Sequence, residues 1–193
     1  MNTFFHIIFI IIFVVFWGIR AAYQKKANQL AGTVEYKEPT LLRRLIGLPF
    51  MLLFLVFVIR PSTLTWFTFS LPQWAQWLGL ALGIISLPLI WWVQWALDIN
   101  FSSTLHIRDE HTLVTHGPYR WLRHPMYTTL YLHELAILLL TANWLIGGMF
   151  LLMQTIIIAR RLKNEEALMV ETFGDEYRSY MQQTGRFLPK LSL

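Results

Sequence analysis

The sequence predicts an all-α, polytopic integral membrane protein with about five transmembrane helices. Of its 193 residues, 55% are hydrophobic and only 14% are charged, whereas a soluble domain carries about a quarter charged residues. Two long stretches, 61–97 and 135–159, contain no charged residue. Such stretches are typical of helices that cross the hydrocarbon core of a bilayer, which takes about 20 apolar residues.

The first three spans follow from the apolar runs of the N-terminal half. We expect 4–19 to be a retained helix rather than a signal peptide, because no Lys or Arg precedes it and no small-residue cleavage site follows. The second span is 45–59, which arginines bound on both sides. Residues 61–72 predict a turn and an interfacial stretch, and 74–97 predict the third span.

The apolar region that begins near Met126 is too long for one helix. Asn143 lies near its middle, so we expect a C-terminal helical hairpin of about 126–142 and 144–162 that turns at 141–143. Each arm would be about 25 Å long at about 1.5 Å per residue, which is just enough to cross.

The basic residues support this arrangement. The segments after the first, third and fifth spans hold 15 of the 16 Lys and Arg residues, and only Arg60 falls on the other side. Cytoplasmic loops carry an excess of basic residues, so we expect the N-terminus outside and the polar segments in the cytoplasm. The net charge of +5 then suits a surface beside anionic lipids. The apolar runs argue against a nucleic-acid-binding protein.

Two polar segments, 98–127 and 160–189, hold the candidate functional groups. Four histidines fall within 19 residues, and their spacings of five, five and eight put no pair on one helix face: His106, His111, His116 and His124. We therefore expect no metal site, and the absence of cysteine excludes thiolate ligands. The histidines could instead bond headgroups or backbone, which is favoured for His106. For His124, at a helix start that suits a carboxylate, a ligand role is equally open.

Two pairs of ionisable residues allow a structural and a functional interpretation. Arg161 and Glu165 share a helix face. They could form an ion pair worth about half a kcal/mol or less when exposed, or hold the carboxylate and the ammonium of a ligand. His133 and Glu134 lie inside the fourth span. Such a pair is either functional or hydrogen-bonded to a neighbouring helix, and the sequence leaves both readings open.

The two polar segments together resemble a known family. The run His124-Pro125-Met126-Tyr127, preceded by Gly117-Pro118-Tyr119-Arg120 and Arg123, resembles the G-P-Y-x-x-x-R-H-P-x-Y motif of the isoprenylcysteine carboxyl methyltransferase family. Residues 161–166 and 173–180 resemble the R-x-x-x-E-E and F-G-x-x-Y-x-x-Y motifs of its tail. Two ordered motifs across a hairpin are more specific than either alone. The resemblance covers about 100–190 and suggests an archaeal or bacterial member that is short at the N-terminus.

The resemblance implies S-adenosylmethionine as methyl donor, bound without a Rossmann domain or a metal. Residues 111–114 would line the adenosine, 124–127 would hold the amino-acid end, and Glu165 would accept from the ammonium. Arg161 would be the catalytic residue that orients the acceptor carboxylate, and Glu134 would join it in binding the acceptor. The full set of implied cofactor contacts is Thr104, whose side chain differs from the family's, and His111, Thr112, Leu113, Val114, His116, Gly117, Tyr119, His124, Pro125, Met126, Tyr127 and Glu165.

The implied chemistry suits these residue types. A carboxylate is already a nucleophile at neutral pH and a sulfonium methyl is already activated, so the protein need only align them and exclude water. A membrane lipid or prenylated acceptor would enter from the bilayer. The expected organisation is a three-helix transmembrane region, 1–97, and a catalytic region, 98–193. The latter would hold the cofactor-binding loop, the hairpin and a C-terminal cytoplasmic helix.

Other functions are also compatible with the sequence. An amine acceptor such as a phospholipid headgroup would need a base, and Glu134 or Glu166 could serve. A membrane oxidoreductase resembling the sterol reductases would bind NADPH, whose phosphates favour more Arg or Lys. A membrane scaffold without activity would leave the two polar motifs unexplained. The sequence gives no indication of oligomeric state.

Overall fold

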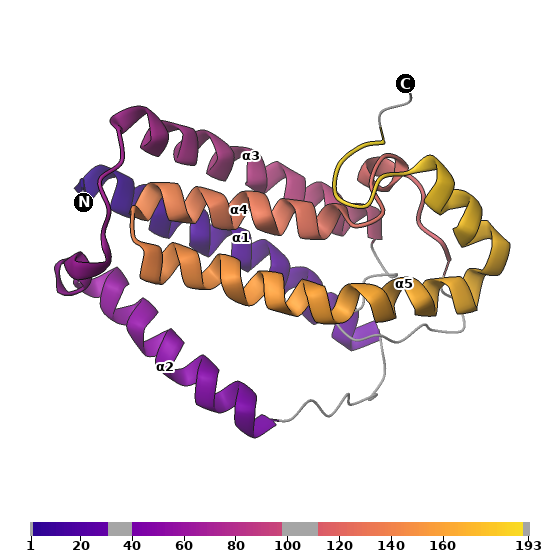
Figure 1. Ribbon diagram of the computed structural model, residues 1–193, viewed down its shortest axis with the longest axis horizontal. Coiled ribbons are helices and arrows are strands. Elements are labelled where there is room, and N and C mark those ends of the chain that lie inside the picture. The colour runs from indigo at the N-terminus through magenta and orange to yellow at the C-terminus, as the bar shows by residue number, and fades with distance from the viewer. Residues whose placement is uncertain (1, 31–39, 98–111, 191–193) are drawn as a thin grey trace.

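The computed structural model describes residues 2–30, 40–97 and 112–190, with only the backbone for 28–30 and 40–47. Within these ranges every regular element is helical, which confirms the all-α class. The elements are α1 (Thr3–Leu30), α2 (Thr40–Ile59), η1 (Pro61–Phe67), α3 (Gln73–Leu97), η3 (Gly117–Arg120), α4 (Pro125–Thr141), η4 (Trp144–Gly148) and α5 (Met149–Gln183). Helices α1, α3, α4 and the first part of α5 run side by side, while α2 diverges from them (Figure 1).

The membrane-spanning character is clear, but the count of five spans is not confirmed. Three stretches are long and apolar enough to cross a membrane, namely Thr3–Ala27, Gln73–Leu97 and Trp144–Gln183. A fourth counts only if Leu48–Ile59 and Pro61–Phe67, bent by 114°, form one broken span. Helix α4 has only 17 residues, because Pro125 begins it and a left-handed residue ends it.

The hairpin turn is where the sequence predicted it. Helix α4 ends at Thr141, and Ala142 adopts a left-handed conformation with φ of 45°. Asn143 is fully buried, accepts a hydrogen bond from the Ile146 amide at 3.1 Å and donates to the Leu64 carbonyl at 3.0 Å. This side chain therefore caps the second arm and ties the turn to η1.

The second arm of the hairpin is longer than expected. Instead of ending near 162, α5 continues to Gln183, with one break at Gly174, where φ is 54° and ψ is −124°. Glycine tolerates this conformation because it has no Cβ. The expected C-terminal cytoplasmic helix is thus the continuation of α5, and it bends across the right-hand end of the bundle (Figure 1). The division of the chain at 97/98 stays a prediction, since 98–111 lie outside the described residues.

Close packing between α3 and α4 depends on small residues, as is common between membrane helices. A Cβ built on Gly79 would lie 2.8 Å from the Leu139 Cβ and 3.1 Å from the Leu140 amide nitrogen. One turn further along α3, a Cβ on Gly83 would lie 2.7 Å from the Ile12 Cδ1 of α1. These glycines let three helices approach one another in the middle of the bundle.

Replacing Gly79 with alanine should therefore force α3 and α4 apart. We expect Gly79→Ala to lower the free energy of unfolding by about 1 to 3 kcal/mol, the usual cost of overpacking, measured by thermal unfolding in detergent. Gly18→Ala is the matched control, because nothing lies within 4 Å of a Cβ there. Equal Tm values for the two variants would contradict the close contact.

Candidate functional site

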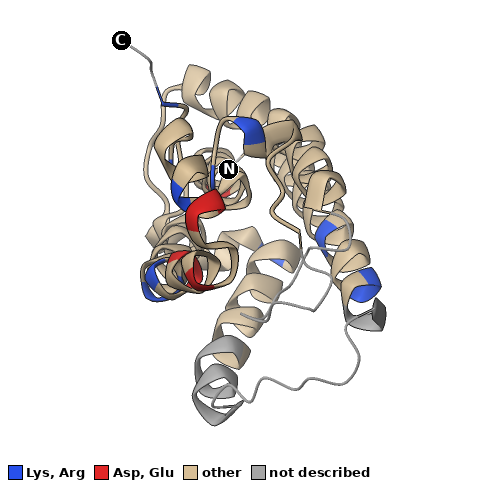
Figure 2. Ribbon diagram, turned by 90° about the vertical axis from the view of Figure 1, so that its right-hand side faces the viewer, with Lys and Arg blue, Asp and Glu red and all other residues tan. Residues whose placement is uncertain are grey.

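The polar motifs converge at one end of the helix bundle. Figure 2 faces the right-hand end of Figure 1 and shows acidic residues beside several basic ones on the ribbon. The backbone of 121–124 pairs there with the segment that follows α5. Arg123 donates its amide hydrogen to the Gly185 carbonyl at 2.8 Å, and His124 donates to the Arg186 carbonyl at 3.1 Å. The C-terminal segment is therefore fastened across the start of α4.

We call this attachment of the C-terminal segment to the start of α4 the closure. One carboxylate, that of Glu166, holds it together. Glu166 accepts from the Arg186 guanidinium at 2.5 and 3.0 Å, from the Arg123 Nε at 3.4 Å and from the His124 Nε2 at 3.2 Å. Arg123 also donates to the carbonyls of Met181 and Thr184. Three segments of the chain thus meet at a side chain that is 10% exposed. Sequence reasoning assigned Glu166 no such role, because its partners lie 20 to 43 positions away.

His124 occupies the N-cap position of α4, as predicted, but its side chain does not cap the helix. The buried ring stacks on Tyr127 and lies between two glutamates, with Nδ1 3.8 Å from Glu165 and Nε2 3.2 Å from Glu166. Burial lowers the pKa of His124 below its usual value, although both carboxylates oppose that shift. The neutral imidazole can therefore donate its Nε2 hydrogen to Glu166 at neutral pH.

Glu165 faces a different set of groups from Glu166, since consecutive helix residues point about 100° apart. The Tyr127 hydroxyl donates to its Oε2 at 2.6 Å. The Glu165 side chain is 31% exposed, so it is open to further donors. Burial, followed by the charge of Glu165, raises the pKa of the nearby Tyr119 phenol. Tyr119 therefore stays a neutral hydrogen-bond donor beside this carboxylate.

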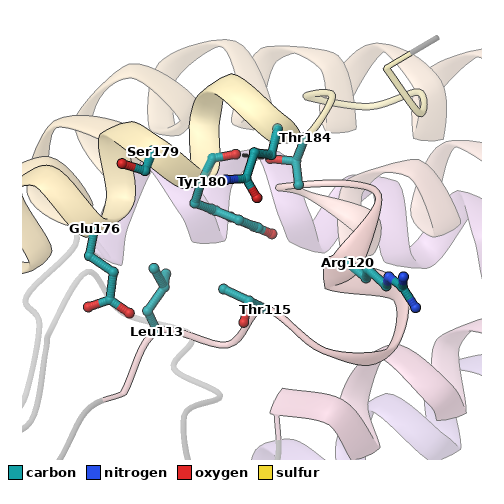
Figure 3. Close-up of a pocket in the computed structure, with 8 residues that line it drawn as sticks. Leu113, Thr115, Arg120, Glu176, Ser179, Tyr180 and Thr184 are labelled. Carbon is teal, nitrogen blue, oxygen red and sulfur yellow. Dashed lines mark hydrogen bonds between the residues drawn. The ribbon is translucent and has the colours of Figure 1, made fainter. Parts of the chain in front are cut away.

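A cavity of about 490 Å³ lies between the segment before η3 and the end of α5. Figure 3 shows Leu113 and Thr115 on one side, and Glu176, Ser179 and Tyr180 on the other. The Tyr180 hydroxyl donates to the Tyr119 carbonyl at 2.6 Å, so the two walls are bonded to each other. The cavity is lined by Leu113, Thr115, Arg120, Glu176, Ser179, Tyr180, Gln183 and Thr184.

Most lining residues of this cavity were not among the predicted contacts. Leu113 belongs to the predicted set, and Tyr180 to the motif F-G-x-x-Y-x-x-Y. Arg120, Glu176 and Ser179 lie at positions that the motifs leave variable, and Thr115, Gln183 and Thr184 lie outside the motifs, so the sequence held no signal for them.

The predicted contacts fall into four groups. Tyr119, His124, Tyr127 and Glu165 lie close together, as described above, with Pro125 buried at the first position of α4. Val114 packs with Tyr119 against α3, and Gly117 has a φ of 59° close to Ala96 and Trp92. Thr112 and His116 are exposed. Thr104 and His111 lie outside the described residues.

The residues assigned to the acceptor are separated. Half-buried Arg161 interacts electrostatically with Tyr127, at the start of α4. Glu134 is buried seven positions further along α4, with one oxygen unpaired among the described residues. Its neighbour His133 stacks on Phe16 with centroids 3.7 Å apart, and its Nδ1 lies 3.3 Å from the Ser86 hydroxyl. These contacts with α1 and α3 favour the structural reading of His133.

No three potential metal ligands gather anywhere in 2–30, 40–97 or 112–190. The candidate site in the described residues consists of carboxylates, phenols, guanidiniums and one imidazole. Such groups recognise a charged organic ligand through hydrogen bonds and ion pairs.

Loss of Glu166 should open this end of the molecule. We expect Glu166→Ala to lower the free energy of unfolding by roughly 3 kcal/mol, because it leaves the buried Arg123 guanidinium without its anion and the His124 Nε2 without its partner. The measurement is thermal unfolding in detergent. Asp175→Ala removes an ion pair to Arg178 that is 94% exposed at the aspartate and should change stability by less than about 0.5 kcal/mol. Similar decreases in the free energy of unfolding for both variants would contradict a structural role for Glu166.

The fold and the site define a helical membrane protein with a polar site at one end of its bundle. A model of the isoprenylcysteine carboxyl methyltransferase (ICMT) family matches residues 77–171. This region contains α3, the 112–124 segment, α4 and the part of α5 with Arg161, Glu165 and Glu166. Over it, the chain is similar to the isoprenylcysteine carboxyl methyltransferase family.

Individual relatives agree with the family match. The chain is 28% identical over 119 residues to a protein-S-isoprenylcysteine O-methyltransferase of Tribolium castaneum, which covers 61% of the chain and 42% of that protein. It is 33% identical over 85 residues to a probable enzyme of the same name from Oryza sativa, covering 44% of each. An uncharacterised Bacillus subtilis protein, YpbQ, is 27% identical over 49% of the chain and 57% of that protein. The chain thus spans less than half the length of the beetle and rice relatives.

A solved structure shares the fold. The eukaryotic intramembrane Ras methyltransferase ICMT superposes with a TM-score of 0.61 at 21% identity, covering 94% of this chain and 67% of that one. The similarity thus extends beyond 77–171 to nearly the whole helical arrangement.

Proposed function

We propose that this chain is an integral membrane methyltransferase that transfers a methyl group from S-adenosylmethionine to the carboxylate of a lipid-tailed, isoprenylcysteine-like acceptor. The observation that carries the proposal is the Glu165 carboxylate, fixed by Tyr127 at 2.6 Å and partly open, in the same helix turn as Arg161. An anchored carboxylate and a guanidinium one helix turn apart match an ammonium and a carboxylate.

The residues fit S-adenosylmethionine. Glu165 would accept from its ammonium, and residues 124–127 would hold its amino-acid end. The 111–114 segment would line the adenosine, and the cavity beside Leu113, about 490 Å³, falls in the usual range for small-molecule sites. Tyr119, Thr112, His116 and Gly117 would complete the contacts, with Thr104 from the preceding segment.

The protein itself need only place and shield the reactants. When bound, S-adenosylmethionine supplies a methyl group that is already activated on a sulfonium. Arg161 orients the acceptor carboxylate, so that one oxygen faces the methyl carbon. The closure held by Glu166, Arg123 and Arg186 excludes water from this end of the bundle. No residue has to take up a proton, because the nucleophile is an anion that becomes a neutral ester.

The membrane arrangement follows from the basic residues. Fifteen of the sixteen Lys and Arg residues lie on one predicted side, so we place the site at the cytoplasmic face and the N-terminus outside. The polar donor would reach the site from the cytoplasm. A prenylated acceptor would arrive laterally from the bilayer, with Glu134 deeper along α4 as a further acceptor contact. The regions 1–97 and 98–193 would serve as membrane scaffold and catalytic part.

The alternative functions are less well supported. An amine N-methyltransferase would need a base, but Glu166 is occupied by Arg186, Arg123 and His124. An NADPH-dependent reductase would need cationic partners for three phosphates. The beetle and rice relatives above are named as isoprenylcysteine O-methyltransferases, which favours the carboxyl methyltransferase over both alternatives.

Cofactor binding tests the proposed donor. We expect the purified protein in detergent to bind S-adenosylhomocysteine at micromolar concentration in calorimetry, without competition from NADPH. Glu165→Ala should weaken binding beyond detection, because the ligand ammonium loses its anion. The exposed Glu171→Ala on the same helix is the control. Failure of the native protein to bind either S-adenosylmethionine or S-adenosylhomocysteine would refute the methyltransferase proposal.

Arg161→Ala tests the division between donor and acceptor. We expect it to leave the Kd for S-adenosylhomocysteine within about threefold and to reduce methyl transfer at least about tenfold, the cost of one charge-assisted contact. The assay is radiolabelled methyl transfer into prenylcysteine analogues and lipid extracts, which also identifies the acceptor. A variant that loses the cofactor would assign Arg161 to the donor instead.

A further inference from the structure

Arg20 of α1 reaches the site from outside the region that matches the family. Its Nη1 lies 3.1 Å from the Met126 Sδ, within the run 124–127. Its guanidinium carbon lies 5.8 Å from the centre of the Trp17 ring. The side chain is half-buried. Helix α1 therefore places a cation beside the start of α4, 106 positions away in the sequence.

Among the described residues, none neutralises the charge of Arg20. Its guanidinium is close enough to that of Arg161 for the two to repel each other. The sulfur of Met126 is a weak acceptor, and Tyr127 gives its hydroxyl hydrogen to Glu165. Within the part of the chain that the structure describes, no carboxylate pairs with Arg20. A half-buried cation next to a like charge is costly unless an anion joins it.

A second donor lies beside Arg20. The Trp17 Nε1 is buried and has no hydrogen-bond partner among the described residues. It is a donor only, so an anionic oxygen acceptor would satisfy both groups. Trp17 packs against a buried apolar cluster of Phe16, Ile90 and Leu130. The two donors thus lie beside apolar side chains of the bundle, which suits a carboxylate with a lipid tail.

We propose that Arg20 binds the acceptor carboxylate together with Arg161, so that α1 supplies a substrate-binding residue to the site. This inference rests on the proposed function. Arg20 contacts Met126 of the 124–127 run, but Trp17 beside it packs against apolar side chains of the bundle, so we assign Arg20 to the lipid-tailed acceptor rather than to the donor. The cavity beside Leu113 lies between the 113–120 segment and α5 instead.

Two guanidiniums would make the site selective for charge. They attract the carboxylate of the substrate but lose this attraction once methylation has made a neutral ester. Arg20 therefore raises affinity for the substrate over the product. Its loss should raise KM for the acceptor at least about tenfold, the loss of one charge-assisted hydrogen bond, while kcat changes less than about threefold.

The experiment compares Arg20→Gln with Arg20→Lys and with Lys25→Gln, an exposed charge on the same helix. All are studied as the full chain in detergent, with N-acetyl-S-farnesylcysteine as acceptor and its methyl ester as product. We expect Arg20→Gln to raise KM and to weaken equilibrium binding of the acid but not of the ester. Arg20→Lys should recover part of the acid affinity, Lys25→Gln should match the native protein, and the Kd for S-adenosylhomocysteine should stay within about twofold.

Several results would overturn the assignment. One is an unchanged KM in Arg20→Gln, and another is equal weakening of acid and ester. A loss of S-adenosylhomocysteine affinity with unchanged acid binding would assign Arg20 to the donor's carboxylate. If the native protein methylates no carboxylate, the proposed function fails, and the preference for acid over ester, measured without turnover, still decides the role of Arg20. A native protein without that preference would refute it.

Discussion

The architecture of the site depends on the Glu166 carboxylate. It binds Arg123 and His124 at the start of α4 and Arg186 beyond the end of α5, so one side chain fixes three segments. Because Glu166 is committed to this closure, its neighbour Glu165 is turned toward Tyr127 and is open to a ligand. Of these two adjacent acids, Glu166 thus has a structural role, and Glu165 is the one that we propose to bind the ligand. A buried acid held by three donors also keeps the C-terminal segment over the site, where it can exclude water.

The fold was largely readable from the sequence, because the bilayer imposes a simple rule on apolar length. The position of the hairpin turn followed from one polar residue, Asn143, in an apolar run. The limits of α5 did not follow, since polar residues after 162 are compatible with either a loop or a continuing helix, and Gly174 breaks the helix through backbone geometry alone. The count of spans failed to be confirmed because α4 is short and α2 bends sharply into η1.

The site was readable only in part. Motifs identify residues such as Tyr127 and Glu165 but not their partners, and the hydrogen bond between these two is a product of folding. Arg186 and Arg20 have their contacts at separations of 20 and 106 positions, where no local pattern exists. Glu134 was assigned to the acceptor together with Arg161, which interacts with Tyr127. It lies about 10 Å along α4 from Tyr127 by helix rise, so one group of a ligand cannot contact both Glu134 and Arg161.

These placements suggest a physical reason for building such a site at the end of a membrane bundle. The carboxylates and phenols near Glu165 lie among the polar segments that we place at the cytoplasmic face, and they suit a polar donor. The guanidiniums of Arg20 and Arg161 come from the first and last helices and are close enough to repel each other, and Trp17 beside Arg20 packs against the apolar cluster of Phe16 and Leu130. In the proposed arrangement, a bilayer-dissolved anion would reach the second group without passing the first. The boundary between water and lipid would thus separate the two substrates, and α4 would hold them in line where that boundary ends.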